Sequence, residues 1–225
     1  MAELVLALDV ASPEAADRLL GRIPEVRWVK LGSVLFTRAG PSMVTSLKDR
    51  GYHVFLDLKW HDIPNTVVGA VRGARAMGVD MVTVHTLGGQ AMLAAAKEAA
   101  GPELAVVGVT VLTSHDPAGF ADVLGRRPVD VAAEVERLAE LARVAGIDGV
   151  VASALETARL RAFLGPDKLL VTPGIRGRGD RPGDQVRVAT AGDAARAGST
   201  HLVVGRPVIE AADAAAAWAA LAAEI

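Results

Sequence analysis

The chain has 225 residues, of which 51% are hydrophobic and 22% are charged, and its formal net charge is -2 at pH 7. This length and composition predict that residues 1–225 fold as one globular domain. No run of Lys or Arg forms a stripe that would neutralise a phosphate backbone, so we expect no nucleic acid partner. The chain has no cysteine, which excludes disulfides, thiolate metal ligands and cysteine nucleophiles.

The N-terminal segment, MAELVLALDVASPEAADRL, has no basic leader. Charged residues also interrupt its apolar run before that run reaches the length of a signal peptide or a membrane span. We therefore expect no membrane association and a cytoplasmic location, and the absence of cysteine agrees with a reducing compartment.

Short β-branched apolar runs alternate along the chain with longer Ala- and Leu-rich segments of helical spacing, which predicts βα units around a parallel sheet. Eight strands are expected, at residues 4–10, 28–32, 54–59, 81–86, 104–110, 149–153, 168–174 and 201–206. The clearest helices are expected at 13–21, 65–78 and 131–146. Left-handed caps near helix ends are expected at Gly21, Gly78, Gly146 and Gly198.

Eight such units in a chain of this length favour a TIM (β/α)8 barrel over an open doubly wound sheet. The turn after the first predicted strand reads DVASPEAA and contains no GxGxxG pattern, so the sequence gives no support for a dinucleotide site. The fold class we predict is therefore a single-domain α/β TIM barrel.

Most predicted strands are apolar until their last residues and then present a polar or charged group. These groups are Asp9, Lys30, Asp57, Lys59, His85, Thr110 and Ser153. In a TIM barrel the C-terminal ends of the strands and their loops form the active site, so side chains that are distant in sequence converge there. The alternative is that some of them are solvated loop residues that merely follow a strand.

The segment FLDLKWHDIPNT places two carboxylates and a lysine within six residues. Residues two apart on a strand point the same way, so Asp57 and Lys59 are expected to face the barrel mouth, with Asp62 on the following loop. Opposite charges buried together are costly unless they are paired and used. A purely structural salt bridge is the alternative, and the addition of Lys30 from the neighbouring strand disfavours it.

The stretch LDLKWHDIPNTV matches the Asp-x-Lys-x-x-Asp signature of the orotidine 5'-phosphate decarboxylase family, with the Ile-Pro-Asn-Thr that follows it there. Around it, in family order, stand ALDV, WVKLG, VTVH, VTVLTS, VTPGIR, GDQVR and VVGRPV. The chain thus resembles this family from residue 4 to residue 209. It departs from the family pattern at Trp60, where Phe is frequent, and at Thr200, where an acidic residue is common.

The resemblance implies decarboxylation of orotidine 5'-monophosphate (OMP) to uridine 5'-monophosphate (UMP) and CO2, the last step of de novo UMP synthesis, without cofactor or metal. It makes Lys59 the general acid and the cation beside ring carbon C6. Asp57 would lie near the departing carboxylate and disfavour the bound ground state more than the transition state. Lys30 would keep Asp57 ionised and complete an alternating array with Asp62.

The resemblance also implies a homodimer in which Asp62, Ile63 and Thr66 reach across the interface, so that a monomer has an incomplete site. Asp9 would bind the ribose hydroxyls. The remaining substrate-binding residues implied are Thr113 and Ser114 for the pyrimidine edge, and Pro173, Arg176, Gln185, Gly205 and Arg206 around the phosphate. Ser153 is a further candidate for a substrate contact.

The loop IRGRGDRPGDQ, residues 175–185, suits a mobile flap that closes on phosphate, with a plain flexible surface loop as the alternative. His85 ends a strand near carboxylates, but no second histidine stands at ligand spacing. We therefore expect a hydrogen-bonding wall there and no metal site.

Two other functions remain open from the sequence. A magnesium-dependent sugar-phosphate decarboxylase or aldolase of the same superfamily also carries Asp-x-Lys-x-x-Asp, and HDIPNT, VLTS and DQVR argue against it. A non-catalytic nucleotide-binding barrel would have little reason to keep Lys30, Asp57, Lys59 and Asp62 together.

Overall fold

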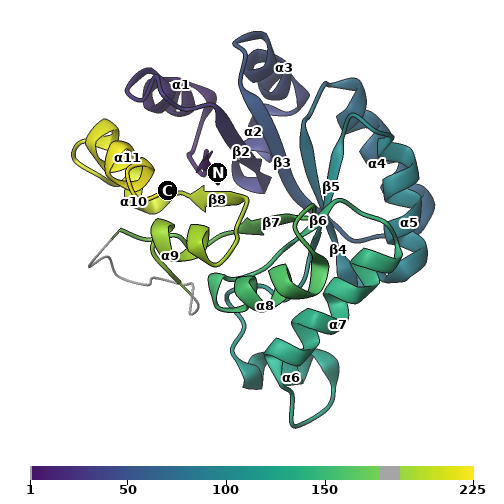
Figure 1. Ribbon diagram of the computed structural model, residues 1–225. Coiled ribbons are helices and arrows are strands. Elements are labelled where there is room, and N and C mark those ends of the chain that lie inside the picture. Colours follow the sequence, from purple (N-terminus) through teal and green to yellow (C-terminus); the bar gives the residue numbers. More distant parts are fainter. Residues whose placement is uncertain (1, 178–187) are drawn as a thin grey trace.

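The structure, a computed structural model, describes residues 2–177 and 188–225. Eight parallel strands pair in sequence order and β8 pairs with β1, which closes the barrel. The helices lie around the outside of the strands (Figure 1). The predicted TIM barrel is confirmed.

All eight predicted strands are present. They are β1 (Glu3–Ala7), β2 (Trp28–Gly32), β3 (His53–Trp60), β4 (Met81–His85), β5 (Ala105–Val109), β6 (Gly149–Val151), β7 (Leu169–Thr172) and β8 (His201–Val204). Asp9, Thr110 and Ser153, which we expected at strand ends, lie one or two residues beyond them in the loops. The polar residues of the barrel mouth therefore come partly from loops.

The three helices predicted at 13–21, 65–78 and 131–146 are present as α1, α4 and α7, to within two residues at each end. The helices of the described residues are α1 (Pro13–Gly21), α2 (Ser33–Ala39), α3 (Pro41–Asp49), α4 (Pro64–Ala76), α5 (Gly89–Ala100), α6 (Pro117–Leu124), α7 (Val131–Val144), α8 (Ala154–Leu164), α9 (Ala191–Arg196), α10 (Arg206–Ile209) and α11 (Ala214–Ala222), with a 3-10 turn at Thr86–Gly88.

Three of the four predicted glycine caps are confirmed, because Gly78, Gly146 and Gly198 have φ of 73°, 75° and 102°. The prediction for Gly21 is wrong. This glycine is the last residue of α1, and the cap is Arg22 with φ of -88°, whose N–H still donates to Leu19 O at 3.1 Å. The right-handed turn continues through Arg22, so no left-handed residue is needed there.

Two apolar clusters account for the core. Alternate residues of each strand point inward and outward, so Val5 and Ala7 of β1 lie inside the barrel while Leu4 and Leu6 pack against the helices. The interior cluster consists of Val5, Ala7, Phe55, Met81, Val107, Val171 and Val203. The barrel is therefore a packed core and not a channel.

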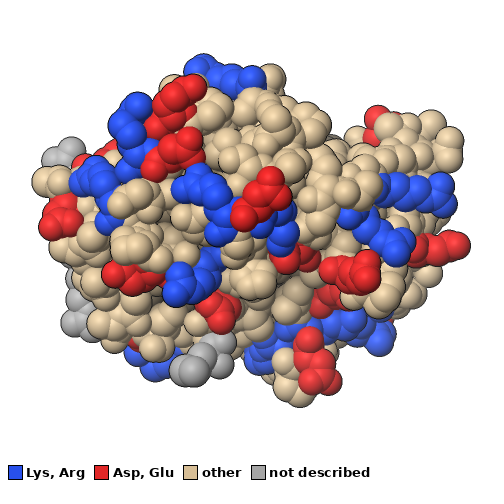
Figure 2. Space-filling view, turned by 90° about the horizontal axis from the view of Figure 1, so that it is seen from above, with Lys and Arg blue, Asp and Glu red and all other residues tan. Residues whose placement is uncertain are grey.

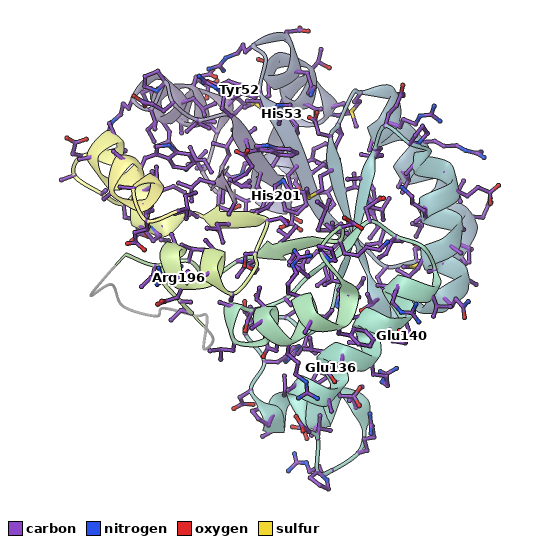
Figure 3. All side chains as sticks on the ribbon, in the orientation of Figure 1. Tyr52, His53, Glu136, Glu140, Arg196 and His201 are labelled. Atoms are coloured by element: carbon purple, nitrogen blue, oxygen red, sulfur yellow. The ribbon has the colours of Figure 1, made fainter. Side chains whose placement is uncertain are left out.

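Aromatic rings from β2, β3 and β8 meet at the N-terminal end of the barrel. Trp28 stacks on His53 with 4.8 Å between ring centroids and meets His201 edge-on at 4.9 Å. Figure 3 labels His53 and His201. Burial lowers the pKa of His201 to about 4, so this ring is neutral at pH 7, and its Nδ1 lies 3.0 Å from the Thr200 hydroxyl.

The same hydrogen bond occurs three times at this end of the barrel. The side chain of the residue just before β4, β6 or β8 accepts from a backbone N–H of the preceding strand, which is β3, β5 or β7. Asp80 accepts from the N–H of Val54 at 2.7 Å, and Asp148 accepts from the N–H of Val106 at 2.8 Å. Thr200 accepts from the N–H of Leu170 at 2.9 Å. Thr200, one of the two departures from the family pattern, thus makes the hydrogen bond that aspartate makes at the other two positions.

A lysine or arginine side chain lies next to each of these three residues, and its hydrogen-bond acceptor differs between the two aspartates and the threonine. Lys48 Nζ lies 2.5 Å from Asp80, and Lys97 Nζ lies 2.7 Å from Asp148. Beside the uncharged Thr200, the guanidinium of Arg161 instead donates to backbone carbonyls, among them Gly165 O at 2.6 Å and Gly198 O at 2.8 Å. A charged side chain therefore ties helix to loop in all three repeats, whether its acceptor is a carboxylate or a carbonyl.

On the face seen in Figure 2, Lys and Arg lie among Asp and Glu instead of gathering in an area of one sign. Some surface ion pairs join residues three apart on one helix, as Arg143 and Glu140 do on α7. Others join residues that are distant in sequence, as Arg50 and Asp17 do. No helix within residues 2–177 and 188–225 is long and apolar enough to cross a membrane.

The Asp148 bridge generates a stability prediction. Asp148→Ala leaves the N–H of Val106 and the ammonium of Lys97 without their carboxylate, and an unmade hydrogen bond at a partly buried group costs about 1–3 kcal/mol. We expect the free energy of unfolding, measured by urea denaturation, to fall by this amount. Asp49→Ala, at an exposed carboxylate in the last turn of α3, is the control. Equal stability of the two variants would contradict the prediction.

Candidate active site

A cavity of about 550 Å³ opens at the C-terminal ends of the strands. Nine of the fourteen residues expected to bind or transform a substrate line it: Asp9, Lys30, Asp57, Lys59, Thr113, Pro173, Arg176, Gly205 and Arg206. They come from the ends of β1, β2, β3, β5, β7 and β8 and the loops that follow. Convergence at the barrel mouth is what closure of the sheet imposes on residues so far apart in sequence.

Asp57 is the centre of the charged groups in this cavity, with 8% of the residue exposed. The ammonium of Lys59 lies 2.8 Å and 2.9 Å from its two carboxylate oxygens. Lys30 Nζ lies 3.5 Å from the same carboxylate and 3.2 Å from Asp9. In one chain the alternating array is therefore Asp9, Lys30, Asp57 and Lys59.

The electrostatics of Asp57 are decided by two opposed effects. Burial by itself raises the pKa of this carboxyl, but the charges of Lys30 and Lys59, with hydrogen bonds from Lys59 and Thr83, together lower the pKa below its ordinary value. Asp57 is therefore ionised at neutral pH. A carboxylate and two ammonium groups are thus held together, with Asp57 and Lys30 largely shielded from water and the Lys59 side chain 40% exposed.

Lys59 reaches Asp57 by a route that strand alternation does not provide. Leu56 pairs with Val82 and Trp60 pairs with Val84, so three residues of β3 stand opposite one residue of β4. Lys59 has φ of 51°, the single positive value for a non-glycine residue in the described part of the chain. Both side chains reach the cavity as expected, but through a β-bulge and a left-handed residue rather than a regular pleat.

Two residues at this site were not singled out from the sequence. A Cβ on Gly32 would lie 3.0 Å from Lys30 Nζ and 3.1 Å from an oxygen of Asp9, so glycine leaves the space in which these two groups meet. Thr83, buried in β4, contacts Asp57 and the backbone of Lys59. The available signals were a glycine ending WVKLG and a hydroxyl inside the apolar run MVTVH.

The loops after β7 and β8 bring to the cavity the basic residues expected to bind phosphate. Arg176 is 8% exposed and its guanidinium donates to Ile175 O at 2.9 Å, while Arg206 follows Gly205 at the end of β8. Gln185 lies outside the described residues, as does most of the predicted flap at 175–185. In the described part of the cavity, the paired carboxylates and ammonium groups thus come from β1 to β3, and the two arginines come from the loops after β7 and β8.

Four expected site residues do not line the cavity: Asp62, Ile63, Thr66 and Ser114. All four are exposed, and Ile63 is 67% exposed. An oxygen of Asp62 accepts from the N–H of Ile63 at 2.6 Å, just before α4 begins. This chain alone does not bring Asp62 into the array that includes Asp57.

His85 and Ser153 also lie outside the cavity lining. His85 stacks on His61 with 5.5 Å between centroids, and burial is the main reason that its pKa falls to about 4. Ser153 is fully buried, and its hydroxyl donates to a carboxylate oxygen of Glu156 at 2.5 Å. The described residues contain no group of three or more His, Cys, Asp or Glu placed to hold a metal ion.

The position of Lys30 generates a titration prediction. Removing its charge with Lys30→Met leaves Asp57 buried beside one cation instead of two, so its pKa should rise. A carboxyl whose pKa is lowered on folding stabilises the fold above its unfolded pKa, and this stability is lost as pH falls through the folded pKa. In the variant the loss therefore begins at higher pH. Titration of 13C-labelled aspartate carboxyls by NMR measures the change. The Asp57 resonance is identified by its absence from the spectrum of Asp57→Asn.

Lys48→Met is the matched control, because Lys48 pairs with Asp80 at the other end of the barrel. It should move the carboxyl resonance of Asp80 and leave that of Asp57 in place. An Asp57 resonance that titrates at the same pH in wild type and Lys30→Met would show that Lys30 is not the cation that matters.

The geometry agrees with comparisons to known proteins. The model of the "Orotidine 5'-phosphate decarboxylase / HUMPS family" matches residues 2–221. Proteins named orotidine 5'-phosphate decarboxylase from Halorhodospira halophila and Alkalilimnicola ehrlichii are 50% and 51% identical over 226 residues, which cover 99% of this chain and 95% of each relative.

Solved structures give the same result. The crystal structure of orotidine 5'-phosphate decarboxylase from Lactobacillus acidophilus superposes with a TM-score of 0.87 at 36% identity, covering 100% of this chain and 99% of the other. An uncharacterized conserved protein from Geobacillus kaustophilus superposes with a TM-score of 0.83 at 35% identity, covering 98% and 99%. The resemblance read from the motifs is confirmed: the chain belongs to the orotidine 5'-phosphate decarboxylase / HUMPS family.

Proposed function

We propose that the chain decarboxylates OMP to UMP and CO2, the last step of de novo UMP synthesis, without cofactor or metal. The observation that carries the proposal is the ionised, buried Asp57 held between Lys30 and Lys59 in the cavity. Relatives with about half of their residues identical carry the name of this enzyme. The cavity volume of about 550 Å³ suits a nucleoside monophosphate.

The chemistry follows from where charge develops. When the bond between C6 and the carboxylate carbon breaks, its electron pair stays on C6, which has no attached group to delocalise it. The Lys59 ammonium stabilises that pair and then donates a proton to C6. The products are CO2 and UMP, and Lys59 becomes a neutral amine. The Lys59 side chain is 40% exposed, so the amine regains its proton from solvent.

Asp57 acts on the ground state. With C6 of bound OMP beside Lys59, the carboxylate attached to C6 would face the ionised carboxylate of Asp57, so the two negative groups would repel each other. The repulsion relaxes as neutral CO2 departs. Lys30 holds Asp57 in place and keeps it ionised.

Binding energy from the far end of the nucleotide offsets that repulsion. Arg176, Arg206 and the Gly205 N–H bind the phosphate, with Gln185 added from outside the described residues. Asp9 binds the ribose hydroxyls, and Thr113 and Ser114 recognise the pyrimidine edge. The substrate is therefore anchored at a distance from the bond that breaks.

The proposal includes a cytoplasmic, single-domain homodimer in which Asp62, Ile63 and Thr66 complete the site of the neighbouring subunit. Supporting this, the three side chains are exposed and do not line the cavity of their own chain. The 67% exposure of Ile63, a large apolar residue, agrees with burial against a second chain.

The activity is tested by following the ultraviolet absorbance of OMP with purified protein in excess EDTA. We expect metal-independent turnover, reduced about a thousandfold or more in Lys59→Ala because the general acid and the cation are lost together. Circular dichroism checks that the variant is folded. Turnover of sugar phosphates only, with added magnesium, would replace the proposal with the magnesium-dependent sugar-phosphate activity that the sequence left open.

The shared site is tested by complementation between two inactive variants. Lys59→Ala and Asp62→Asn subunits, co-expressed with different tags, are purified as hybrid dimers. One site of each hybrid then carries both substitutions and the other carries neither, so activity should return to about half of the wild-type value for a two-fold symmetric dimer. A hybrid as inactive as its parents would rule out an Asp62 contribution across the interface.

A further inference from the structure

Thr83 joins the two residues proposed to perform the chemistry although it does not line the cavity. It stands in the middle of β4 and is 1% exposed. Its hydroxyl accepts a hydrogen bond from the backbone N–H of Lys59 at 2.8 Å and donates one to Asp57 Oδ1 at 3.0 Å. One side-chain atom therefore contacts both members of the ion pair.

The bulge in β3 explains why a side chain is needed at this point. Between the pairs Leu56–Val82 and Trp60–Val84, β3 advances four residues while β4 advances two. The Lys59 N–H has a side-chain acceptor on β4 instead of a carbonyl of the regular ladder. Because Lys59 has φ of 51°, a conformation that a residue with a Cβ disfavours, the bulge needs such support.

The two hydrogen bonds use the hydroxyl in complementary ways. A threonine hydroxyl has one proton to donate and two lone pairs that accept. A lone pair accepts from the Lys59 N–H, so the proton is free to be donated to Asp57. Asp57 Oδ1 thus receives the Thr83 hydroxyl and the Lys59 ammonium, while Oδ2 faces Lys59 at 2.9 Å and Lys30 at 3.5 Å. The plane of the carboxylate and the backbone of Lys59 are held by the same atom.

We propose that Thr83 is a positioning residue for the decarboxylation, holding the Asp57 carboxylate and the Lys59 backbone in register through its single hydroxyl. The inference rests on the proposed function, since it concerns the same site. It predicts that the hydroxyl affects the chemical step and leaves the affinity for the nucleotide unchanged, because Thr83 is separated from the cavity by the pair that it holds.

The test compares Thr83→Val, which keeps the shape and removes the hydroxyl, with Thr83→Ser, which keeps the hydroxyl and removes the methyl. Loss of a hydrogen bond to a charged group, with a buried N–H left unpaired, should lower kcat about tenfold to a hundredfold in Thr83→Val. We expect the Kd for UMP, from calorimetry, to stay within about twofold, because UMP lacks the carboxylate that Asp57 repels. Thr83→Ser should recover kcat to within about threefold of wild type.

Thr86→Val is the matched control. Thr86 is also buried, lies three residues further along, and donates to Val109 O at 2.7 Å without touching Asp57 or Lys59. It should lower the melting temperature while kcat stays near the wild-type value. If Thr83→Val does not fold, Thr83→Ala and Thr83→Ser give the same comparison, because they differ by the hydroxyl alone.

The outcomes separate this inference from the proposed function. If wild type does not consume OMP, the proposed function fails before any variant is compared. If wild type is active and Thr83→Val keeps its kcat, the positioning role is wrong. It is also wrong if Ser and Val impair kcat equally, or if the Kd for UMP rises in parallel with the loss of kcat, because either result indicates general distortion of the pocket.

Discussion

The site depends on keeping the carboxylate of Asp57 ionised inside the barrel. Burial opposes that charge, and the two ammonium groups of Lys30 and Lys59 outweigh burial. Removing either cation would leave a buried carboxylate with too little compensation, the situation in which a carboxyl takes up a proton instead. The surrounding features can be read as means to bring these three groups together: the glycine that leaves space for Lys30, and the bulge that turns Lys59 back toward Asp57.

Pairs of aspartate and lysine have different roles at the two ends of the barrel. At the N-terminal end, Asp80 and Asp148 accept a strand N–H as well as a lysine ammonium, so these carboxylates complete the sheet. At the mouth, Asp57 is held by the side chains of Lys30, Lys59 and Thr83 and faces a cavity. A carboxylate tied to the main chain supports the fold, whereas one held by side chains beside a cavity remains available to a substrate.

Much of this arrangement was predictable because it follows from periodicity. The alternation of apolar runs predicted eight strands, and closure of a parallel barrel then brings Asp9, Lys30 and Asp57 to one end. The conformation of Lys59 was not predictable, because two-residue spacing indicates a regular pleat and the bulge depends on Thr83 of another strand. A pattern within one segment does not contain the hydrogen bonds that a second segment supplies.

The charges of the described array clarify what a neighbouring subunit would add. Asp9, Lys30, Asp57 and Lys59 sum to zero, so one chain offers the substrate carboxylate a site of no net charge. Asp62 of the partner subunit would make the array net negative, which increases repulsion of the OMP carboxylate. Such a site can be filled only if the phosphate is bound strongly elsewhere. Arg176 and Arg206, which line the same cavity from the loops after β7 and β8, are placed for that task, so the strength of phosphate binding limits how much repulsion the reacting end can apply.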